Sequence, residues 1–264
     1  MCPSGVGSRF ARAHSLIAPA LELQHVTKRF GTKTAVDDLS LSIAPGSFVG
    51  LLGRNGAGKS TTLKMATGLV DPTAGRISVL GHDLATHSLE ARRLMGVMPE
   101  DMALLELLTG RQYLSFVGRM YGLEDAQIVQ RGGELFETLD LRPGPGTLVG
   151  DYSFGMKKKL ALCAALIHGP QILFLDEPFE GIDAVTNRTI KDILLSLQDR
   201  GVTLVLTSHI LEVVEKLCPL IAIIDEGRLR NFGTLADLRN GSDSLESTFL
   251  TMVGGPPRAG LSWL

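Results

Sequence analysis

The sequence predicts an α/β fold, in which a mostly parallel sheet is combined with a smaller antiparallel β region and an inserted group of helices. Three observations predict it. An apolar run at residues 48–52 leads through a glycine-rich segment into a helical segment at 62–67. In the second half, short apolar runs alternate with helical segments, which indicates parallel strands joined by helices. Between these parts, from residue 101, the pattern changes to helical periodicity.

Composition limits the classes of function. The 264 residues are 44% hydrophobic and 20% charged, which suits one large domain or two small ones with an ample core. The formal net charge of −2 gives no basic character that would indicate a nucleic-acid partner. The longest apolar runs, 160–167 and 217–224, are far shorter than the roughly 18 residues of a membrane-spanning helix. Cys2, Cys163 and Cys218 show no paired or metal-ligand spacing, and we expect the last two to be core residues in a reducing compartment.

The first hundred residues predict β structure after an extended start. Residues 1–19 lack the apolar core of a secretory signal; their arginine-rich, acid-poor composition is shared with organelle transit peptides, but we expect a disordered extension. Leu21 to Ile43 reads as β structure with alternating apolar residues. Further elements follow in order: a turn at 71–75, a strand at 76–80, a helix at 88–93 and a strand at 94–98 that ends at Pro99.

Helical patterns dominate from residue 101 to about 158. Thr109 and Gln112 form a capping box that opens a helix, in which Tyr113, Val117 and Tyr121 share one face. A second helix is expected from Glu124 to Leu141, weakened by Gly132 and Gly133. An apolar cluster precedes the helix that Thr109 caps, and it either lines a groove or belongs to the core. Its residues are Leu104, Leu105, Leu107 and Leu108.

The remaining chain alternates helices and strands, as a parallel sheet requires. Helices are expected at 153–167, 184–200, 210–217, 234–239 and 244–252, and strands at 171–175, 202–206 and 220–224. Three lysines stand early in the first of these helices, where they oppose its dipole and so need a polar partner or solvent: Lys157, Lys158 and Lys159. We expect one domain at residues 20–253 and a flexible tail at 254–264.

A phosphate-binding loop is predicted between the first buried strand and the following helix. Its glycines allow sharp turns that aim backbone N–H groups inward, and the new helix begins there with its positive end toward an anion. Lys59 is expected to reach the β- and γ-phosphates, and the Ser60 hydroxyl to bind Mg²⁺. The loop reads Gly53-Arg54-Asn55-Gly56-Ala57-Gly58-Lys59-Ser60-Thr61.

Two consecutive acids, Asp176 and Glu177, follow an apolar strand at the sheet edge where ligands of open α/β sheets bind. Acids directly after apolar residues are costly to bury unless they are paired or near a metal. We expect Asp176 to hold Mg²⁺, directly or through water, and Glu177 to orient or deprotonate an attacking water. Phe30, before Gly31, is either an ordinary core or edge phenylalanine or an aromatic that stacks on adenine.

In these motifs the chain resembles the nucleotide-binding domains of ABC transporters, over nearly all of residues 21–253 and in the family's order. The loop at 53–60 is similar to the Walker A motif, the strand at 172–177 to Walker B, and 180–183 to the D-loop. The resemblance implies a P-loop NTPase fold, a RecA-like sheet with an antiparallel β subdomain and a helical subdomain at about 100–158. It also implies that Glu177 is the catalytic glutamate, that His209 contacts the γ-phosphate and that Phe30 stacks on adenine.

Two motifs depart from the common pattern of the family. Glu100 stands after Pro99 where glutamine is usual, and as an oxygen acceptor it is a further candidate for contact with Mg²⁺ or water. The signature reads Tyr152-Ser153-Phe154-Gly155-Met156. Ser153 and Gly155 are retained, and the resemblance implies that they contact ATP held by a partner subunit. Phe154 adds a bulky side chain and Met156 lacks an amide, which puts in doubt how tightly the ATP sandwich closes.

The departures look like the ABC-2 branch, composed mostly of exporters. The resemblance implies ATP and Mg²⁺ as ligands, a homodimer, a transmembrane permease partner and a place at the cytoplasmic face of a membrane, without nucleic acid. Three alternatives stay open at this point: an importer subunit, a soluble ABC-type ATPase of DNA repair or translation, and a regulatory module that binds ATP without turnover.

Overall fold

The computed structural model describes residues 18–239 and 245–254. Within them, two sheets are present, a six-stranded sheet in the order β10-β9-β3-β8-β7-β6 and a four-stranded sheet in the order β2-β1-β4-β5. The strands β3, β6, β7, β8 and β9 pair in parallel, and β10 pairs antiparallel with β9. The bounds of the strands are β1 Leu21–Phe30, β2 Lys33–Ile43, β3 Phe48–Leu52, β4 Ala74–Val79, β5 His82–Asp83, β6 Met95–Met98, β7 Ile172–Asp176, β8 Thr203–Ser208, β9 Leu220–Asp225 and β10 Arg228–Thr234.

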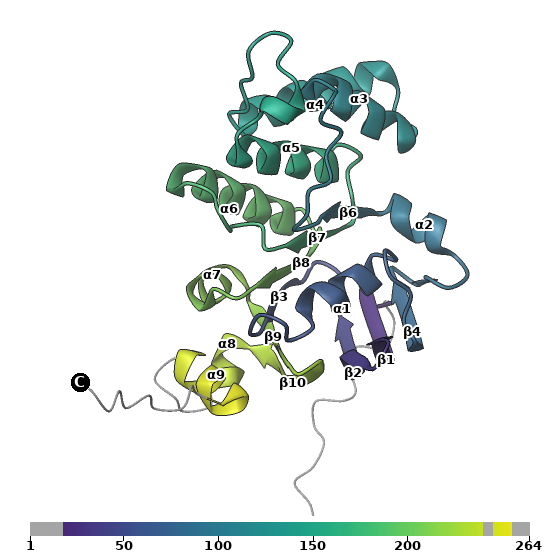
Figure 1. Ribbon diagram of the computed structural model, residues 1–264, viewed down its shortest axis with the longest axis vertical. Helices are drawn as coiled ribbons and strands as arrows, with labels where there is room; N and C mark the ends of the chain where they lie inside the picture. Colours follow the sequence, from purple (N-terminus) through teal and green to yellow (C-terminus); the bar gives the residue numbers. More distant parts are fainter. Residues whose placement is uncertain (1–17, 240–244, 255–264) are drawn as a thin grey trace, which may run out of the picture.

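Helices connect these strands and cover the larger sheet, and three of them lie together at one end of the molecule (Figure 1). That group consists of α3 Gly110–Met120, α4 Asp125–Thr138 and α5 Phe154–Leu166. The other helices are α1 Lys59–Ala66, α2 Ser88–Arg93, α6 Ala184–Asp199, α7 Leu211–Leu217, α8 Leu235–Arg239 and α9 Leu245–Val253. A single 3-10 turn, Val149–Asp151, precedes α5 in the described chain.

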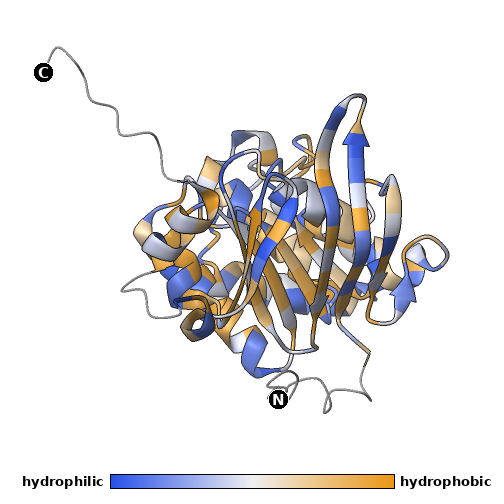
Figure 2. Cartoon of the chain, turned by 90° about the horizontal axis from the view of Figure 1, so that it is seen from below, coloured by the Kyte–Doolittle hydropathy of each residue, from blue (hydrophilic) through white to orange (hydrophobic). Residues whose placement is uncertain are grey.

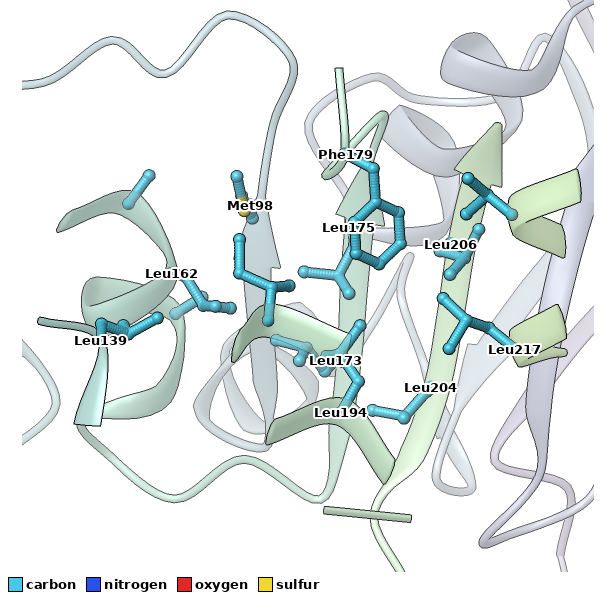
Figure 3. Close-up of a cluster of buried hydrophobic side chains, with 14 of the residues drawn as sticks. Met98, Leu139, Leu162, Leu173, Leu175, Phe179, Leu194, Leu204, Leu206 and Leu217 are labelled. Carbon is cyan, nitrogen blue, oxygen red and sulfur yellow. The ribbon is translucent and has the colours of Figure 1, made fainter. Parts of the chain in front are cut away.

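The central strands are buried on both faces, because each strand sends alternate residues into two separate cores. From β7, Leu173 and Leu175 enter the core beneath α5, α6 and α7, where Figure 3 shows them beside Leu204 and Leu206 of β8. Phe174 of the same strand enters the other core, beneath α1 and the four-stranded sheet. This is why the central strands read as continuous apolar runs, while strands of the outer sheet alternate in hydropathy (Figure 2).

The helical group is built as its sequence predicts at the first helix. Thr109 caps α3 by accepting from the N–H of Gln112, and the Gln112 side chain accepts in return from the N–H of Thr109. Tyr113 and Val117 pack against the core, and Tyr121 stacks on His168 with ring centroids 3.7 Å apart. The apolar cluster before α3 divides between the two expected roles. Leu104 packs on the core and Leu108 lines a groove beside α3, whereas Leu107 is 86% exposed.

Several boundaries differ from the sequence prediction for physical reasons. Helix α1 begins at Lys59 rather than Thr62, because the phosphate loop itself supplies the first turn. Strand β8 continues two residues beyond Leu206, since Thr207 and Ser208 pair with β7 and β3. The strand β10 was not predicted, because its residues have no regular apolar alternation and it forms by pairing with β9.

The sequence also predicts features of the chain ends, the cysteines and the membrane-spanning potential of the helices. The predicted N-terminal extension and C-terminal tail lie outside it, apart from residues 18, 19 and 254, and so does Cys2. Cys163 and Cys218 are free and buried, as expected, and burial raises the pKa of the Cys163 thiol to about 12. Among the helices of residues 18–239 and 245–254, none combines the length and hydropathy needed to cross a membrane.

Gly133 in α4 offers a test of how the helical group is stabilised. No atom lies within 4 Å of the position that a Cβ at Gly133 would occupy, so Gly133→Ala is expected to raise the free energy of unfolding by roughly 0.5–1 kcal/mol. The matched control is Gly96→Ala in β6, where the new Cβ would lie 2.2 Å from the carbonyl oxygen of Ala165. The free energy of unfolding of this variant is expected to fall by about 1–3 kcal/mol, because the clash forces the surrounding structure to shift. Urea denaturation measures both, and a loss of stability in Gly133→Ala would contradict the prediction.

Candidate functional site

The phosphate loop lies between β3 and α1, tightly packed against two other segments. Gly56 and Gly58 adopt φ values of +81° and +105°, which side-chain-bearing residues rarely adopt. A Cβ on Gly53 would lie 2.3 Å from the carbonyl oxygen of Ile224 in β9. A Cβ on Gly58 would lie 2.6 Å from that of Ala35 in β2. The loop therefore requires glycine at these positions both for its turns and for its close contact with both sheets.

Lys59 is almost completely buried, with 6% of its surface exposed. Its Nζ donates to the carbonyl oxygens of Gly53 at 2.8 Å and Arg54 at 3.3 Å, and lies 3.9 Å from Glu177 Oε1. Burial lowers the pKa of Lys59, and the nearby carboxylates, Glu177 first, act in the opposite direction. The ammonium group thus lies across the loop, close to the predicted acids.

Asp176 is the last residue of β7 and is 1% exposed. Its Oδ1 accepts a hydrogen bond from Ser60 Oγ at 3.0 Å and another from Thr207 Oγ1 at 2.5 Å. Its Oδ2 is buried without a hydrogen-bond partner, although buried carboxylate oxygens are rarely left unpaired. An orphaned carboxylate oxygen beside a serine hydroxyl fits a divalent cation with oxygen ligands.

A cation held there would need oxygen atoms from water or a bound phosphate as its other ligands. Among the residues that the structure describes, no group of three or more His, Cys, Asp or Glu side chains is placed to bind a metal. Hard cations such as Mg²⁺ commonly combine one or two protein ligands with substrate phosphates and water.

Glu177 follows directly and has an unusual backbone conformation, with φ of +47° in a residue other than glycine. Such a conformation costs on the order of 1–3 kcal/mol and persists only where surrounding contacts impose it. The N–H of Glu177 donates to Thr207 Oγ1 at 3.0 Å. On the other side, its Oε1 lies 3.0 Å from Nδ1 of His209. The carboxylate of Glu177 is therefore held beside His209 and Lys59.

One pocket collects most of the predicted site residues. It is lined by the loop from Asn55 to Thr61, by Glu100, Glu177 and Glu180, by His209, and by Lys33 and Ala35 of β2. Burial, followed by the negative charge of Asp176, raises the pKa of Glu100. Acids and a buried lysine around a glycine-rich loop form a pocket suited to a phosphate chain with a cation.

Five predicted site residues lie outside this pocket lining. Gly53 and Asp176 contact the loop and strands beside it, as described above, and the other three are Phe30, Ser153 and Gly155. Phe30 is 51% exposed at the end of β1, with the Lys28 ammonium 5.1 Å from its ring centre. Ser153 caps α5 by accepting from the N–H of Met156 at 3.3 Å. Around Gly155, no atom lies within 4 Å of the position that a Cβ would occupy. The signature segment at Ser153–Gly155 therefore has open space beside Gly155 and does not belong to the pocket that the phosphate loop of its own chain lines.

The sequence did not indicate two residues that support the site. Thr207 stands opposite Asp176 in the register of β7 and β8, and its hydroxyl serves both Asp176 and Glu177. The signal available was that both strands end at the same sheet edge. Lys158 of α5 donates to the carbonyl oxygens of Glu177 and Glu180, for which the sequence offered no signal beyond its early place in a helix.

Comparison with known proteins gives consistent matches. Residues 36–180 match the family described as ABC transporter, a range that includes the loop and both acids but neither Phe30 nor His209. The chain is 38% identical to the linearmycin resistance ATP-binding protein of Bacillus subtilis (strain 168), over 85% of this chain and 73% of that protein. It is 40% identical to the Nod factor export ATP-binding protein I of Paraburkholderia xenovorans (strain LB400), over 79% and 69% respectively.

A solved structure agrees with the fold. The structure described as an ATP binding subunit of an ABC transporter superposes with a TM-score of 0.83 at 30% sequence identity. The alignment covers 88% of this chain and 99% of that one. The two sheets and the helical group therefore form an arrangement that a known ATP-binding subunit shares.

The double role of the Thr207 hydroxyl predicts an unusual cost for its removal. Thr207→Val keeps the shape of the side chain but removes two hydrogen bonds, the one accepted from the Glu177 N–H and the one donated to Asp176 Oδ1. We therefore expect the free energy of unfolding to fall by about 1–3 kcal/mol. The matched control is Thr189→Val on α6, whose hydroxyl donates only to the Val185 carbonyl, with an expected change within about 0.5 kcal/mol. Equal losses in the two variants, measured by urea denaturation, would rule out the special role of Thr207.

Proposed function

The chain belongs to the ABC transporter family, and we propose that it binds and hydrolyses ATP to power a membrane exporter of the ABC-2 type. The observation that carries the proposal is the pocket in which a phosphate loop, a buried lysine and the strand-end acid Glu177 meet, while the other strand-end acid, Asp176, accepts a hydrogen bond from Ser60 of the loop. Export is supported by the relative named for Nod factor export, which is similar to this chain over most of both lengths.

In this proposal the phosphate loop binds the triphosphate of ATP. Backbone N–H groups of residues 55–61 donate hydrogen bonds to the phosphate oxygens, and Lys59 exchanges its bonds with the loop carbonyls for contact with the β- and γ-phosphates. Ser60 and Asp176 are the residues that would hold Mg²⁺, with Glu100 as a further candidate for contact with it or with water. When bound, Mg²⁺ neutralises the charge that develops on the phosphates. Phe30 remains a proposal for adenine stacking.

Glu177 is proposed as the general base. Its carboxylate lines the pocket and lies next to His209, so it can accept a proton from water that attacks the γ-phosphate while the imidazole contacts that phosphate. The left-handed backbone at Glu177 supports this role, because strain of this kind gathers at functional sites.

A second copy of the chain is proposed to complete each ATP site. Ser153 and Gly155 belong to the family's ATP contacts but lie outside the lining of their own chain's pocket. The open space around Gly155 leaves room for the triphosphate held by a partner. Two ATP molecules would then sit between two protomers, and the higher affinity of the closed state for ATP would drive closure.

The membrane partner is proposed to be a transmembrane permease that contacts the helical group from the cytoplasmic side. Apolar side chains gather on the surface there: Leu107 is 86% exposed, Met120 72% and Phe116 46%. Phe116 and Met120 line the same groove of α3, together with Leu108. Exposed apolar side chains that line one groove are typical of a protein contact.

Substitution of the proposed base tests the mechanism. Glu177→Gln keeps the shape of the side chain but cannot accept the proton, so hydrolysis is expected to fall by roughly 10²–10⁴-fold while ATP still binds. The closed dimer should accumulate with ATP and Mg²⁺, which size-exclusion chromatography with light scattering detects. Phosphate release measures turnover.

Lys59→Ala is the companion variant, and it separates binding from chemistry. This variant is expected to lose ATP affinity and to stay monomeric, because the phosphate contact itself is removed. Wild-type turnover in Glu177→Gln would show that Glu177 is not the base, and an unmodified chain that neither binds nor hydrolyses ATP would refute the proposed function.

The acid in place of the usual glutamine provides another test. If Glu100 contacts Mg²⁺ or its water, Glu100→Gln should raise the Mg²⁺ concentration needed for half-maximal hydrolysis by about tenfold, since a neutral amide binds a hard cation less strongly. Titration of ATPase rate with Mg²⁺ measures the shift. A nearby acid outside the pocket lining, Asp101, provides the control Asp101→Asn, which should leave the titration unchanged.

A further inference from the structure

Lys158 is a buried lysine that the proposed reaction does not use. It lies in α5, is 3% exposed and does not belong to the lining of the phosphate-loop pocket. Its Nζ donates to the carbonyl oxygen of Glu177 at 2.8 Å and to that of Glu180 at 2.5 Å. A buried ammonium group is costly unless its protons find acceptors, and here two backbone carbonyls provide them.

The two carbonyls belong to the turn that carries the proposed base. The N–H of Glu180 donates to the Glu177 carbonyl at 3.3 Å, which closes the turn. Thr207 holds the N–H of Glu177, and Lys158 holds its carbonyl. The left-handed backbone of Glu177 is thereby fixed on both sides by side chains from β8 and α5. Release of either contact frees the backbone to relax and the carboxylate to move.

Phe154 extends the same contact to the start of α5. Its ring centre lies 5.3 Å from Lys158 Nζ, within reach of a cation–π interaction, one helical turn away on the same face. A Cβ on Gly181 would lie 2.6 Å from Cε1 of this ring. The ring therefore rests on the backbone that follows Glu180. Phe154 and Lys158 together join the signature segment, at Ser153–Gly155, to the turn at 177–181.

We propose that Lys158 is a positioning residue, which holds Glu177 in its working conformation and ties it to the signature segment. This inference rests on the proposed function, in which Ser153 and Gly155 meet the partner's ATP while Glu177 acts on the ATP of its own chain. Lys158 then connects the two ATP sites of the dimer through one side chain. A shift of α5 when the signature meets ATP is passed to the base of the other site.

The charges around Lys158 oppose the effect of its burial on the pKa of its ammonium group. The carboxylates of Glu180, Glu177 and Glu100 favour its charged form. Burial acts against them and is the larger effect, so the pKa of Lys158 lies below its ordinary value. Lys157, the next residue, points elsewhere and pairs with Glu106 Oε1 at 2.7 Å.

The first experiment compares Lys158→Met with Lys158→Arg in the full-length chain. Lys158→Met fills the space but donates no hydrogen bond, so kcat should fall by about tenfold or more while the ATP dissociation constant, measured with the non-hydrolysing background Glu177→Gln, stays within about twofold. Lys158→Arg retains donors and should restore at least about a third of kcat. Lys157→Met is the matched control and should keep the wild-type kcat.

A purely structural role predicts a different result. It would lower the melting temperature and the folded fraction of Lys158→Met, with kcat per folded molecule unchanged, and this outcome overturns the proposal. If Lys158→Met does not fold, Lys158→Gln replaces it, because its amide leaves fewer carbonyls unpaired; an unchanged kcat per folded molecule in that variant would be equally decisive against it.

The connection to the signature has its own test. If Lys158 links the two segments, the effects of Ser153→Ala and Lys158→Met on kcat should be non-additive, with the double variant at least about threefold more active than the product of the single effects predicts. Additive effects would overturn the link. These failures are distinct from that of the proposed function, because they occur in a chain whose wild type hydrolyses ATP; a wild type without hydrolysis refutes the proposed function and this inference together.

Discussion

The hydrogen bonds that Asp176 receives from Ser60 and Thr207 bring three segments together at one end of the central sheet. A carboxylate buried to this degree must be partnered, and its partners come from the phosphate loop and from the neighbouring strand. Because Thr207 also accepts from Glu177, the same hydroxyl sets the backbone of the next acid. The pocket depends on this contact, since it fixes the loop, the carboxylate proposed to bind Mg²⁺ and the proposed base relative to one another.

The site is preorganised by close packing rather than by flexibility. A Cβ on Gly53 or Gly58 would clash with the carbonyl oxygen of Ile224 or Ala35, so the loop cannot accept larger residues at these positions. Glu177 has strained backbone geometry and stands between two buried lysines, with Lys59 toward its carboxylate and Lys158 on its carbonyl. Such an arrangement holds the charged groups of Glu177, Lys59 and Lys158 in fixed positions before a ligand binds. The proposed reaction then requires less rearrangement of these groups.

The contacts of Phe154 explain how the unusual signature is accommodated in the fold. The bulk of Phe154 raised doubt about closure of an ATP sandwich, yet its ring lies on Gly181 and beneath Lys158 of the same chain. It thus supports the turn that carries Glu177, while Gly155 beside it stays open. The departure from the common family pattern is therefore consistent with a working enzyme in which the signature and the base are mechanically joined.

Local sequence determined which residues are candidates for the chemistry. The order strand, glycine loop and helix predicts Lys59 and Ser60, and two acids after an apolar run predict Asp176 and Glu177. Local sequence also determined most strands and helices, because burial on one or both faces leaves a period in the chain. Three features depend on the tertiary structure alone. They are the formation of β10 by pairing with β9, the hydrogen bonds of Thr207 and the contacts of Lys158. Thr207 lies 31 residues from Asp176, and Lys158 lies 19 residues from Glu177. Contacts at such separation depend on strand register and helix packing, for which no local pattern of residues exists.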